Sequence, residues 1–414
     1  MAASMDDLLV GLDIGSSKVA LVAVAREPDG TLTYVNGAYR QSVGIRRGNV
    51  VDIASAAESI RGAVVDLEQR VGRRISRVVV NVSGTHVRGQ VGRGSVTPMG
   101  HEIGMADLER AIADAQESFA PGEQHDILHS LEHAWSVDGQ DGIIDPRGMS
   151  GYRLDVDMHF TTAISTMINN LNRGVSHAGL HLEMPVATSL AVGEAVFPLE
   201  SDADCLVIAD IGAAVTDVVV YVGGRVWANA VLPLGGGDVT REIMDQFKLN
   251  QAAAEDVKQR YGHCDPAQVD EYELVEMPAS TGFDALLPRA DLARVVRQGA
   301  SGLALALGHQ IEDVRAAGFE PRQMIITGGG SELAGLDHLL MGATDVPVSR
   351  GVTRGIRYLP PGLQRPVFAT AAGLVIWYAR NGGSESAASA SLNKLGRFPV
   401  FLTGMRKILR VVLP

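Results

Sequence analysis

Two segments of the chain carry the same short pattern, in which an aspartate and a glycine lie at a turn between two apolar runs. Residues 9–22 read LVGLDIGSSKVALV and residues 206–219 read LVIADIGAAVTDVV. Val, Leu and Ile favour strands on both sides of each turn, and glycine permits a tight turn. Such a hairpin exposes backbone N–H groups that can bind phosphate oxygens, and an Asp beside it can hold Mg²⁺. The pair predicts a phosphate and metal site, with Asp13 and Asp210 facing each other across a cleft.

Two further features favour this interpretation over two ordinary β-turns, which either segment alone would equally fit. Lys18 follows the first turn and can reach phosphates as a point charge. A glycine-rich segment, TGGGS at 327–331, follows a predicted strand at 323–327, and backbone without Cβ atoms lets a flat adenine or ribose pack closely. The chain has no G-x-x-x-x-G-K-[ST] pattern, which excludes a P-loop protein.

These motifs resemble those of the actin, heat-shock chaperone and sugar kinase superfamily. Within it, three segments resemble the FtsA family of bacterial cell-division proteins: GIRRGNVVDI at 44–53, VDGQDGIIDPRGMSG at 137–151 and VLPLGGGDVTREI at 231–243. The resemblance covers essentially the whole chain. It implies an α/β fold of the actin-like, two-lobed, duplicated ATPase type. It also implies a small inserted subdomain in place of the usual second subdomain, and a C-terminal amphipathic helix.

The resemblance also implies roles for particular residues. ATP-binding positions are Asp13, Gly15, Ser16, Ser17, Lys18, Gly212, Gly235, Gly236, Glu255, Lys258, Gly328, Gly329 and Gly330. Asp13 and Asp210 hold Mg²⁺, Asp210 is also catalytic, and Glu183 matches the carboxylate that positions the attacking water in hydrolytic relatives. Without the resemblance, the Glu255–Lys258 spacing fits a surface ion pair on one helix face equally well.

One departure from the family pattern concerns the second phosphate loop. Where relatives usually have Gly-Gly-Gly-Thr-Thr-Asp, this chain has GAAVTD at 212–217. Methyl groups of Ala213 and Ala214 replace hydrogens where backbone should approach phosphates, and alanine resists the positive φ values that glycine tolerates. We therefore expect ATP binding with weak or no hydrolysis.

The predicted organisation follows the two turns and the changes in composition. The first lobe takes residues 5–84, 161–198 and about 366–381, and the inserted subdomain takes 85–160, with a helical stretch at 105–118. The second lobe takes 199–233 and 323–365, its outer subdomain 234–322, a Gly/Ser/Ala-rich linker 382–397 and the terminal helix 398–414. Helical spacing also marks 52–72, 291–315 and 368–380, and 77–83 is a predicted buried strand.

Composition restricts the class of protein. The 414 residues are 46% hydrophobic and 20% charged, which is typical of a globular chain of two or more domains. A formal charge of −12 argues against nucleic-acid binding, and two cysteines suit a reducing compartment. The start of the chain does not resemble a secretory signal, and no apolar run is long enough to span a bilayer, so a cytoplasmic protein is expected. The histidines at 125, 129 and 133 have a helical metal-site spacing, but their segment has strand-like content. A metal site is not expected there, nor at His263 and Cys264.

The end of the chain differs from the rest. Residues 386–414 contain no acidic residue and five basic ones, on a chain that is acidic overall. Wound as a helix, 398–413 places its bulky apolar residues within an arc of about 140° and its basic residues beside that arc. The predicted membrane-contacting residues are Phe398, Phe401, Leu402, Met405, Arg406, Lys407, Ile408, Leu409, Arg410, Val412 and Leu413. A helix docked on the protein's own core is the alternative, but an in-plane helix on an anionic bilayer explains the linker and the charge together.

The resemblance therefore predicts a scaffold protein more than an enzyme. It implies that the chain binds ATP and Mg²⁺, self-associates into filaments and tethers the tubulin-like FtsZ ring to the cytoplasmic face of the cell membrane. It further implies that the protein works at the division site and recruits later division proteins there. Two rivals share the fold: a small-molecule kinase, for which no sugar-pocket acid or base is evident, and an adaptor of a pilus or other envelope machine, which needs no basic tail.

Overall fold

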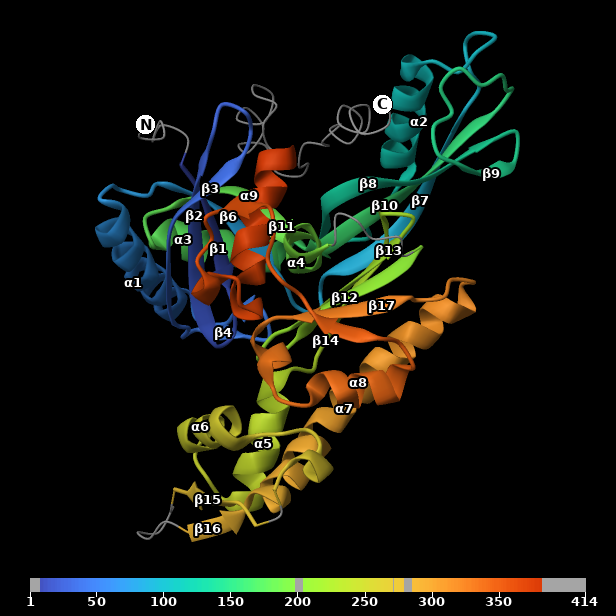
Figure 1. The fold of residues 1–414 in the computed structure, drawn as a ribbon. Helices are drawn as coiled ribbons and strands as arrows, with labels where there is room; N and C mark the ends of the chain where they lie inside the picture. Colours follow the sequence, from blue (N-terminus) through green and yellow to red (C-terminus); the bar gives the residue numbers. More distant parts are fainter. Residues whose placement is uncertain (1–7, 198–203, 271, 279–284, 382–414) are drawn as a thin grey trace.

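The computed structural model describes residues 8–197, 204–270, 272–278 and 285–381. They form two lobes, each built on a mixed β-sheet, with a small α/β unit beside the first lobe and a largely helical unit extending from the second (Figure 1). Within these ranges, no helix combines the length and apolar character needed to span a membrane. The linker predicted at 382–397 and the helix predicted at 398–414 lie outside the described residues.

The first-lobe sheet combines an antiparallel meander with three strands that pair in parallel. Its strands, in spatial order, are β11 (His181–Ala187), β6 (Arg77–Val82), β1 (Leu8–Ile14), β2 (Lys18–Arg26), β3 (Leu32–Gln41) and β19 (Ile356–Arg357). Both faces are buried: Leu21 of β2 belongs to one apolar cluster with Ile60, and its neighbour Val22 to another with Val375. Near-continuous apolar strands are the expected consequence of helices on both faces.

Four helices cover this sheet: α1 (Ile53–Val71), α3 (Ser165–His177), α4 (Thr188–Val196) and α9 (Ala369–Asn381). Helix α1 begins at Asp52, whose side chain accepts the N–H groups of Ala54 and Ser55, and ends at Gly72 with φ of 73°. The helices expected at 52–72 and 368–380 are confirmed by α1 and α9. A short hairpin, β4 (Ile45–Arg46) and β5 (Asn49–Val50), precedes α1.

The inserted unit is a four-stranded antiparallel sheet packed against one helix. Its strands are, in order, β7 (Arg88–Val96), β10 (Leu154–Ile164), β8 (His125–Val137) and β9 (Gln140–Ile143), and the helix is α2 (Met105–Ser118). It has its own apolar core, which includes buried Trp135 and Phe160. Gly94 allows α2 to approach β7, because a Cβ there would lie 2.1 Å from the Ala111 carbonyl oxygen.

The second-lobe sheet repeats the topology of the first. Its strands are, in order, β14 (Arg225–Leu232), β13 (Thr216–Val222), β12 (Cys205–Ile211), β17 (Gln323–Thr327) and β18 (Val348–Arg350). The hairpin register also repeats, since Ile14 pairs with Val19 in the first lobe and Ile211 pairs with Thr216 in the second. The duplicated fold predicted from the two Asp-Ile-Gly segments is confirmed.

The remaining elements extend the second lobe. They are α5 (Gly236–Phe247), α6 (Gln251–Tyr261), α7 (Arg289–Ala316), α8 (Leu336–Thr344), the hairpin β15 (Leu274–Met277) and β16 (Ala285–Pro288), and the 3₁₀ turns η2 (Pro266–Gln268), η3 (Gly329–Glu332), η4 (Pro361–Leu363) and η5 (Pro366–Phe368). Figure 1 shows α5, α6, β15 and β16 projecting below the second-lobe sheet.

One segment differs from the predicted division of the chain. The sequence predicts residues 323–365 to belong to the second lobe, yet β19 within that range pairs with β3 of the first-lobe sheet. The physical reason is the chain path. After β18 the chain returns to α9 on the first lobe, and on the way it covers the otherwise open edge of β3.

The two lobes meet through α4 and α9. A Cβ on Gly193 of α4 would lie 1.9 Å from Tyr221 Oη of β13, and Thr370 Oγ1–H of α9 donates to Asp210 Oδ2 of β12 at 2.8 Å. Buried Asn229 on β14 adds a polar junction. Its Oδ1 accepts His159 Nε2–H at 2.8 Å and Thr161 Oγ1–H at 3.3 Å, and its Nδ2 donates to Ser189 Oγ at 3.3 Å. One side chain of the second lobe thus contacts both the inserted unit and α4.

Truncation of this junction is expected to destabilise the fold. Asn229→Ala leaves buried donors on His159 and Thr161 without an acceptor, at about 1–3 kcal/mol for each unsatisfied group. We expect the free energy of unfolding, measured by urea denaturation, to fall by about 3 kcal/mol. Asn172→Ala, at an exposed position of α3, is the matched control. A loss below about 1 kcal/mol for Asn229→Ala would contradict the assigned role of the junction.

Candidate nucleotide site

The two Asp-Ile-Gly turns have the same backbone geometry. Gly15 N–H donates to the Lys18 carbonyl oxygen at 2.9 Å, and Gly212 N–H donates to the Val215 carbonyl oxygen at 2.9 Å. Each turn closes the hairpin at the carboxyl end of the central strand of its sheet. Open α/β sheets bind ligands at the carboxyl ends of their strands, so the two turns lie where a ligand between the lobes is expected.

Asp13 and Lys18 form the charged part of the first turn. Lys18 Nζ donates to Asp13 Oδ2 at 2.7 Å, and both side chains are largely buried. Asn81, near the end of the neighbouring strand β6, holds the turn in place because its Oδ1 accepts Ile14 N–H at 2.7 Å. Ser16 Oγ accepts Gly48 N–H at 3.2 Å, which connects the turn to the β4–β5 hairpin. The ammonium group of Lys18 is therefore held beside Asp13 at the first turn.

Asp210 lies on the second turn, in a tightly packed environment. Thr370 Oγ1–H from α9 donates to Asp210 Oδ2 at 2.8 Å. Gly328, with φ of 79°, packs against the same carboxylate, since a Cβ there would lie 2.1 Å from Asp210 Oδ1. Burial raises the pKa of Asp210 to about 6, although the Thr370 hydrogen bond opposes that shift; the charge of Asp13 adds to it. A divalent cation would relieve the cost of two buried carboxylates.

A third carboxylate, Asp217, belongs to the same site. It pairs directly across the hairpin from Asp210, so both side chains lie on one face of the sheet. Ser83 Oγ–H donates to Asp217 Oδ2 at 2.6 Å, whereas Oδ1 is buried without a hydrogen-bond partner. Burial and the charge of Asp210 raise the pKa of Asp217 well above its ordinary value. An unpartnered buried oxygen fits an ordered water; in the described part of the chain no three His, Cys, Asp or Glu side chains are arranged to hold a metal ion.

The glycine segment at 235–237 begins α5 against the second turn. Gly236 N–H donates to the Gly212 carbonyl oxygen at 2.9 Å and Gly237 N–H to that of Ala213 at 2.7 Å. A Cβ on Gly235 would lie 2.6 Å from the Gly212 carbonyl oxygen, so glycine is required for this approach. The N-terminus of α5 is consequently fixed against the second turn, and a helix N-terminus is a place that favours anions.

Glu255 and Lys258 lie beside this helix start. Lys258 Nζ donates to Glu255 Oε2 at 2.7 Å, to Thr240 Oγ1 at 2.8 Å and to the Gly236 carbonyl oxygen at 3.0 Å. Burial opposes ionisation of Glu255, but Lys258 and its hydrogen bonds lower the pKa of that carboxyl overall. The contact with Gly236 distinguishes this pair from a solvated ion pair, because it connects α6 to the glycine segment.

The segment Gly328–Gly330 completes the group. A Cβ on Gly330 would lie 2.5 Å from Ile211 Cγ2, and a Cβ on Gly236 would lie 3.5 Å from Gly330 Cα. The two glycine segments therefore face each other beside the second turn. Of the predicted site residues, the structure brings together those of the two turns, the two glycine segments and the Glu255–Lys258 pair.

The strain expected at Ala213 and Ala214 is absent. Neither residue has a positive φ, so alanine meets no backbone penalty there. The expectation assumed a left-handed loop, whereas the loop is closed by ordinary turn hydrogen bonds to Val215 and to Gly236 and Gly237. The remaining effect of the alanines is the space that their methyl groups occupy.

Restoring glycine should therefore lower the stability of the fold while raising the rate of ATP turnover. The double variant Ala213→Gly with Ala214→Gly loses chain rigidity without relieving strain. We expect the free energy of unfolding to fall by about 1–2 kcal/mol. ATP turnover, measured by phosphate release, is expected to rise because backbone donors gain room at the phosphates. An unchanged or lower rate in the folded double variant would show that the methyl groups do not limit hydrolysis.

Glu183 does not lie with these residues, which corrects the expectation drawn from its EMPVATS segment. In β11, Val186 is the residue that pairs with Asn81 at the level of the first turn, and Glu183 lies three residues earlier, roughly 10 Å along the strand. Its side chain accepts Tyr378 Oη–H at 3.2 Å and lies 3.8 Å from Arg77. It therefore faces the opposite end of the sheet, too far away to position water at the turns.

The three histidines predicted to lie on a strand do so, in β8. His129 Nε2 accepts Ala187 N–H at 3.0 Å, His125 Nδ1 contacts the Glu123 carbonyl oxygen and His133 Nδ1 contacts the Val226 carbonyl oxygen. Each ring thus has a separate partner. Burial lowers the pKa of His129 to about 3, so this ring is neutral and serves as a structural acceptor.

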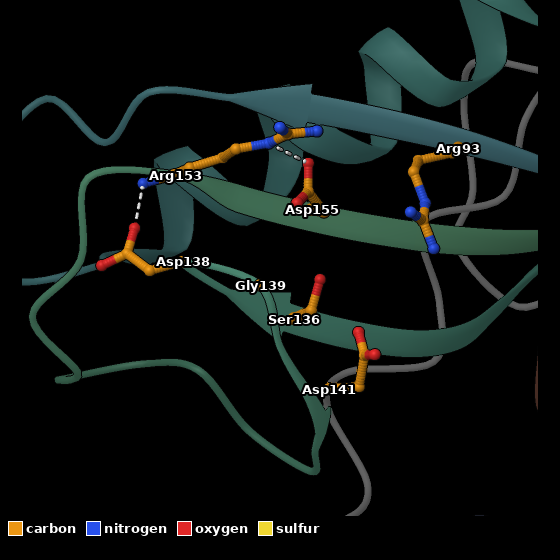
Figure 2. A pocket seen from close by; sticks show the side chains of 7 residues that line it. All are labelled: Arg93, Ser136, Asp138, Gly139, Asp141, Arg153 and Asp155. Carbon is orange, nitrogen blue, oxygen red and sulfur yellow. Dashed lines mark hydrogen bonds and ion pairs between the residues drawn. The ribbon is translucent and has the colours of Figure 1, made fainter.

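A polar pocket of about 510 Å³ lies in the inserted unit, away from the turns (Figure 2). Within it, Arg153 Nε–H donates to Asp155 Oδ1 at 2.9 Å. Arg93 donates two hydrogen bonds, of 2.6 and 2.8 Å, to Asp157. Since both guanidinium groups are already paired with carboxylates, this pocket has no excess positive charge for a phosphate ligand.

Comparison with known proteins decides the family. A family model described as "SHS2 domain inserted in FTSA" matches residues 84–162, and one described as "Cell division protein FtsA" matches residues 207–373. The chain is 30% identical over 372 residues to the cell division protein FtsA of Neisseria meningitidis, with 88% of each protein covered. The chain belongs to the FtsA family of cell-division proteins.

Other relatives agree with this assignment. FtsA of Pseudomonas aeruginosa is 29% identical over 374 residues, with 89% of each protein covered. FtsA of Bacillus subtilis is 28% identical over 381 residues, with 91% of this chain and 84% of the relative covered. Among solved structures, a chain of a PilM–PilN type IV pilus biogenesis complex has a TM-score of 0.61 at 22% identity, covering 89% of this chain and 97% of its own. ADP-bound MreB5 of Spiroplasma citri has a TM-score of 0.52 at 11% identity, covering 90% and 96%.

These likenesses fix the fold as actin-like, with the FtsA-type insertion confirmed. Family membership gives this FtsA-family chain a role in cell division, and its fold is one that binds nucleotides. Sequence reasoning missed Asp217, Ser83 and Thr370. Asp217 could have been found from its hairpin position opposite Asp210, whereas Thr370, which lies on a helix 160 residues away from its partner, carried no signal.

Proposed function

We propose that this FtsA-family chain binds ATP with Mg²⁺ between its lobes, assembles with copies of itself and anchors the FtsZ ring to the cytoplasmic membrane. It would act at the division site and recruit later division proteins there. The observation that carries the nucleotide part is the duplicated turn. Two carboxylates, Asp13 and Asp210, come from equivalent positions of two lobes, beside glycine segments that leave no room for side chains.

The residues of the chain fit the parts of a nucleotide. Asp13 and Asp210 would hold Mg²⁺, which would neutralise phosphate charge. Lys18, the two turns and the N-terminus of α5 would bind the phosphates. Glu255 and Lys258 would contact the ribose, and Gly328–Gly330 would pack against the adenine.

Weak hydrolysis fits the same residues. Glu183 lies at the far end of the strand, and the methyl groups of Ala213 and Ala214 occupy the second loop. Bound ATP would then act mainly by holding the lobes in one relative position. The contacts that α4 and α9 make with the second lobe, together with the Asn229 junction, would transmit that position to the inserted unit. A nucleotide-dependent shape of this kind supports assembly more directly than turnover.

The membrane part of the proposal rests on the sequence of residues 386–414. Their five basic residues and absence of acids, next to an apolar arc, fit an in-plane helix on an anionic bilayer. The kinase alternative gains no support, because the turns and glycine segments supply only nucleotide-type contacts. The pilus-adaptor alternative shares the fold with the PilM–PilN complex, but it leaves the basic tail without a use.

A reconstitution on supported bilayers tests the proposal. Labelled FtsZ filaments are expected to accumulate on bilayers with anionic phospholipid only when this protein, ATP and Mg²⁺ are present together. Omitting nucleotide, or deleting residues 398–414, is expected to remove most of the bound FtsZ. Equal accumulation without the protein's tail would contradict the tethering role, and equal accumulation without nucleotide would contradict the ATP-dependent assembly.

A further inference from the structure

The end of the first lobe farthest from the phosphate turns carries a cluster of exposed basic side chains. We define this basic corner by Arg61, Arg73, Arg74, Arg77, Arg173, His177 and His181. All seven side chains are exposed, on a chain whose net charge is −12. The cluster therefore opposes the sign of the protein as a whole.

The fold brings these residues together from three elements. Arg73 and Arg74 follow the end of α1, and Arg77 begins β6. His181 begins β11 directly opposite Arg77 in the parallel register, and its N–H donates to the Ser76 carbonyl oxygen at 2.8 Å.

The last turn of α3 completes the corner. It carries Arg173 and His177 four residues apart, so both side chains share one helix face. Arg61 of α1 donates to the His177 carbonyl oxygen at 2.6 Å, which joins α1 to the end of α3. The corner is thus one continuous surface at the amino ends of β6 and β11.

Among the residues that the structure describes, few acidic groups lie beside this surface. Glu58 and Glu68 lie on α1, and Glu68 Oε1 accepts Ile75 N–H at 2.8 Å. Glu183 faces Arg77 at 3.8 Å, and Asp66 is paired with Arg40 by two hydrogen bonds. Helix α3 contributes no acidic residue at all. Counted over the described residues, the corner keeps a positive excess, to which Arg74 and Arg173 contribute.

The corner borders the point at which the chain leaves the first lobe toward its basic tail. Glu183, which faces Arg77, accepts Tyr378 Oη–H at 3.2 Å, and Tyr378 is one helical turn before Asn381, the last residue of α9. Arg380 is ion-paired with Glu194 of α4, which fixes this end of α9. About sixteen residues separate Asn381 from Phe398, a reach of roughly 55 Å at full extension.

We propose that the basic corner is a second membrane-contacting surface, which binds the phosphate groups of anionic lipids once the tail has docked. The inference rests on the proposed tethering by the tail and goes beyond it. Because the linker confines the corner near the bilayer, its binding is effectively intramolecular, and weak contacts suffice. Since the first phosphate turn lies at the carboxyl end of β1, which pairs parallel with β6, this orientation leaves the nucleotide site facing away from the bilayer.

Vesicle co-sedimentation of the full chain with ATP and Mg²⁺ tests this proposal. Each basic residue near an anionic surface contributes roughly a fivefold gain in affinity at low salt. We expect Arg74→Gln with Arg173→Gln to weaken binding to vesicles containing phosphatidylglycerol by tenfold or more. The deficit should shrink as salt rises. The charge-matched control, Arg260→Gln with Arg322→Gln at exposed sites of the second lobe, should bind like the wild type.

A second measurement reports orientation directly. Cys205 and Cys264 are buried, and burial raises their thiol pKa values to about 11 and about 12, so a single introduced cysteine can be labelled selectively. A dye on Ser176→Cys, within the corner, is expected to be quenched by headgroup-labelled lipid. The same dye on Ser301→Cys, exposed on α7, is expected to stay bright. Equal quenching at both sites would overturn the orientation.

The outcomes separate this inference from the tethering proposal. If Met405→Glu still binds vesicles, tethering by the tail fails whatever the corner does. If Met405→Glu is released while Arg74→Gln with Arg173→Gln binds like the control, tethering stands and the corner proposal is overturned. If the corner variant binds vesicles normally but no longer recruits FtsZ, the corner binds an acidic protein segment instead of lipid, which also overturns it.

Discussion

Asp210→Ala is expected to abolish Mg²⁺-dependent ATP binding, with affinity falling roughly a hundredfold or more. The substitution removes one of the two carboxylates proposed to hold Mg²⁺ and leaves the Thr370 hydroxyl without its acceptor. Glu183→Ala is the matched control, because it also deletes a carboxylate but at the far end of the sheet. Calorimetric titration with Mg·ATP measures both. Equal affinities in the wild type and Asp210→Ala would contradict the assigned role.

Removing the Asp210 charge should weaken Mg·ATP binding but stabilise the ligand-free fold. Burial raises the pKa of Asp210 to about 6 from an ordinary value of 3.8, so the ionised carboxylate destabilises the ligand-free fold. As pH rises, the Asp210 carboxyl loses its proton in the unfolded state before it does so in the folded state. The contribution of Asp210 to the free energy of unfolding therefore falls as pH rises from about 4 through 6. Asp210→Asn keeps the shape and the Thr370 contact without the charge. It should raise the ligand-free unfolding free energy at pH 7 by on the order of 2–3 kcal/mol while still losing Mg·ATP binding.

Regular elements could be predicted from the sequence because their signals are local. The apolar spacing at 291–315 gave α7 at Arg289–Ala316, and the stretch 105–118 gave α2 with the same bounds. The duplicated turns also carried their topology, since an apolar strand, a glycine turn and a second apolar strand can pair only as a hairpin. The strand β19 could not be predicted this way, because two residues completing a distant sheet edge have no periodic signal of their own.

The candidate site could be predicted in part, where a sequence motif itself marks the turn on which the residues lie. Asp13, Asp210 and the glycine segments lie at turns that the sequence marks by itself. Asp217 required the cross-strand register, which puts it opposite Asp210, and Thr370 required knowledge of how α9 packs. Glu183 shows the reverse error. It matches the family segment by sequence, but β11 continues through Met184 and Pro185 toward the turns. Glu183 therefore lies about three residues before the end of the strand that is nearest the site.

The alanines of the second loop illustrate a different limit. A change from glycine to alanine predicts strain only if the backbone at that position is left-handed. At Ala213 and Ala214 it is not, and the loop closes on Gly236 and Gly237 through ordinary hydrogen bonds. Residue type alone could not distinguish a steric effect on the ligand from a conformational effect on the loop.

Met405→Glu or Ile408→Glu is expected to release the protein from anionic vesicles while leaving the nucleotide lobes folded. Both positions fall within the apolar arc predicted for residues 398–413. A carboxylate there opposes burial in the bilayer and is repelled by lipid phosphates. Full burial of such a side chain contributes about 1.5–3 kcal/mol, of which an interfacial helix realises part. Vesicle flotation measures the bound fraction, and thermal unfolding checks the lobes.

Assembly should magnify this effect, because one filament presents many tails and each further tail binds an already tethered object. The comparison therefore needs ATP and Mg²⁺ present. Thr403→Glu is the matched control: it adds the same charge outside the apolar arc, so only the electrostatic part of binding should weaken, mainly at low salt. Arg406→Ala with Arg410→Ala should weaken binding to anionic vesicles but not to neutral ones. If both arc variants float with vesicles as the wild type does, the terminal helix packs on the protein and the tether must lie elsewhere.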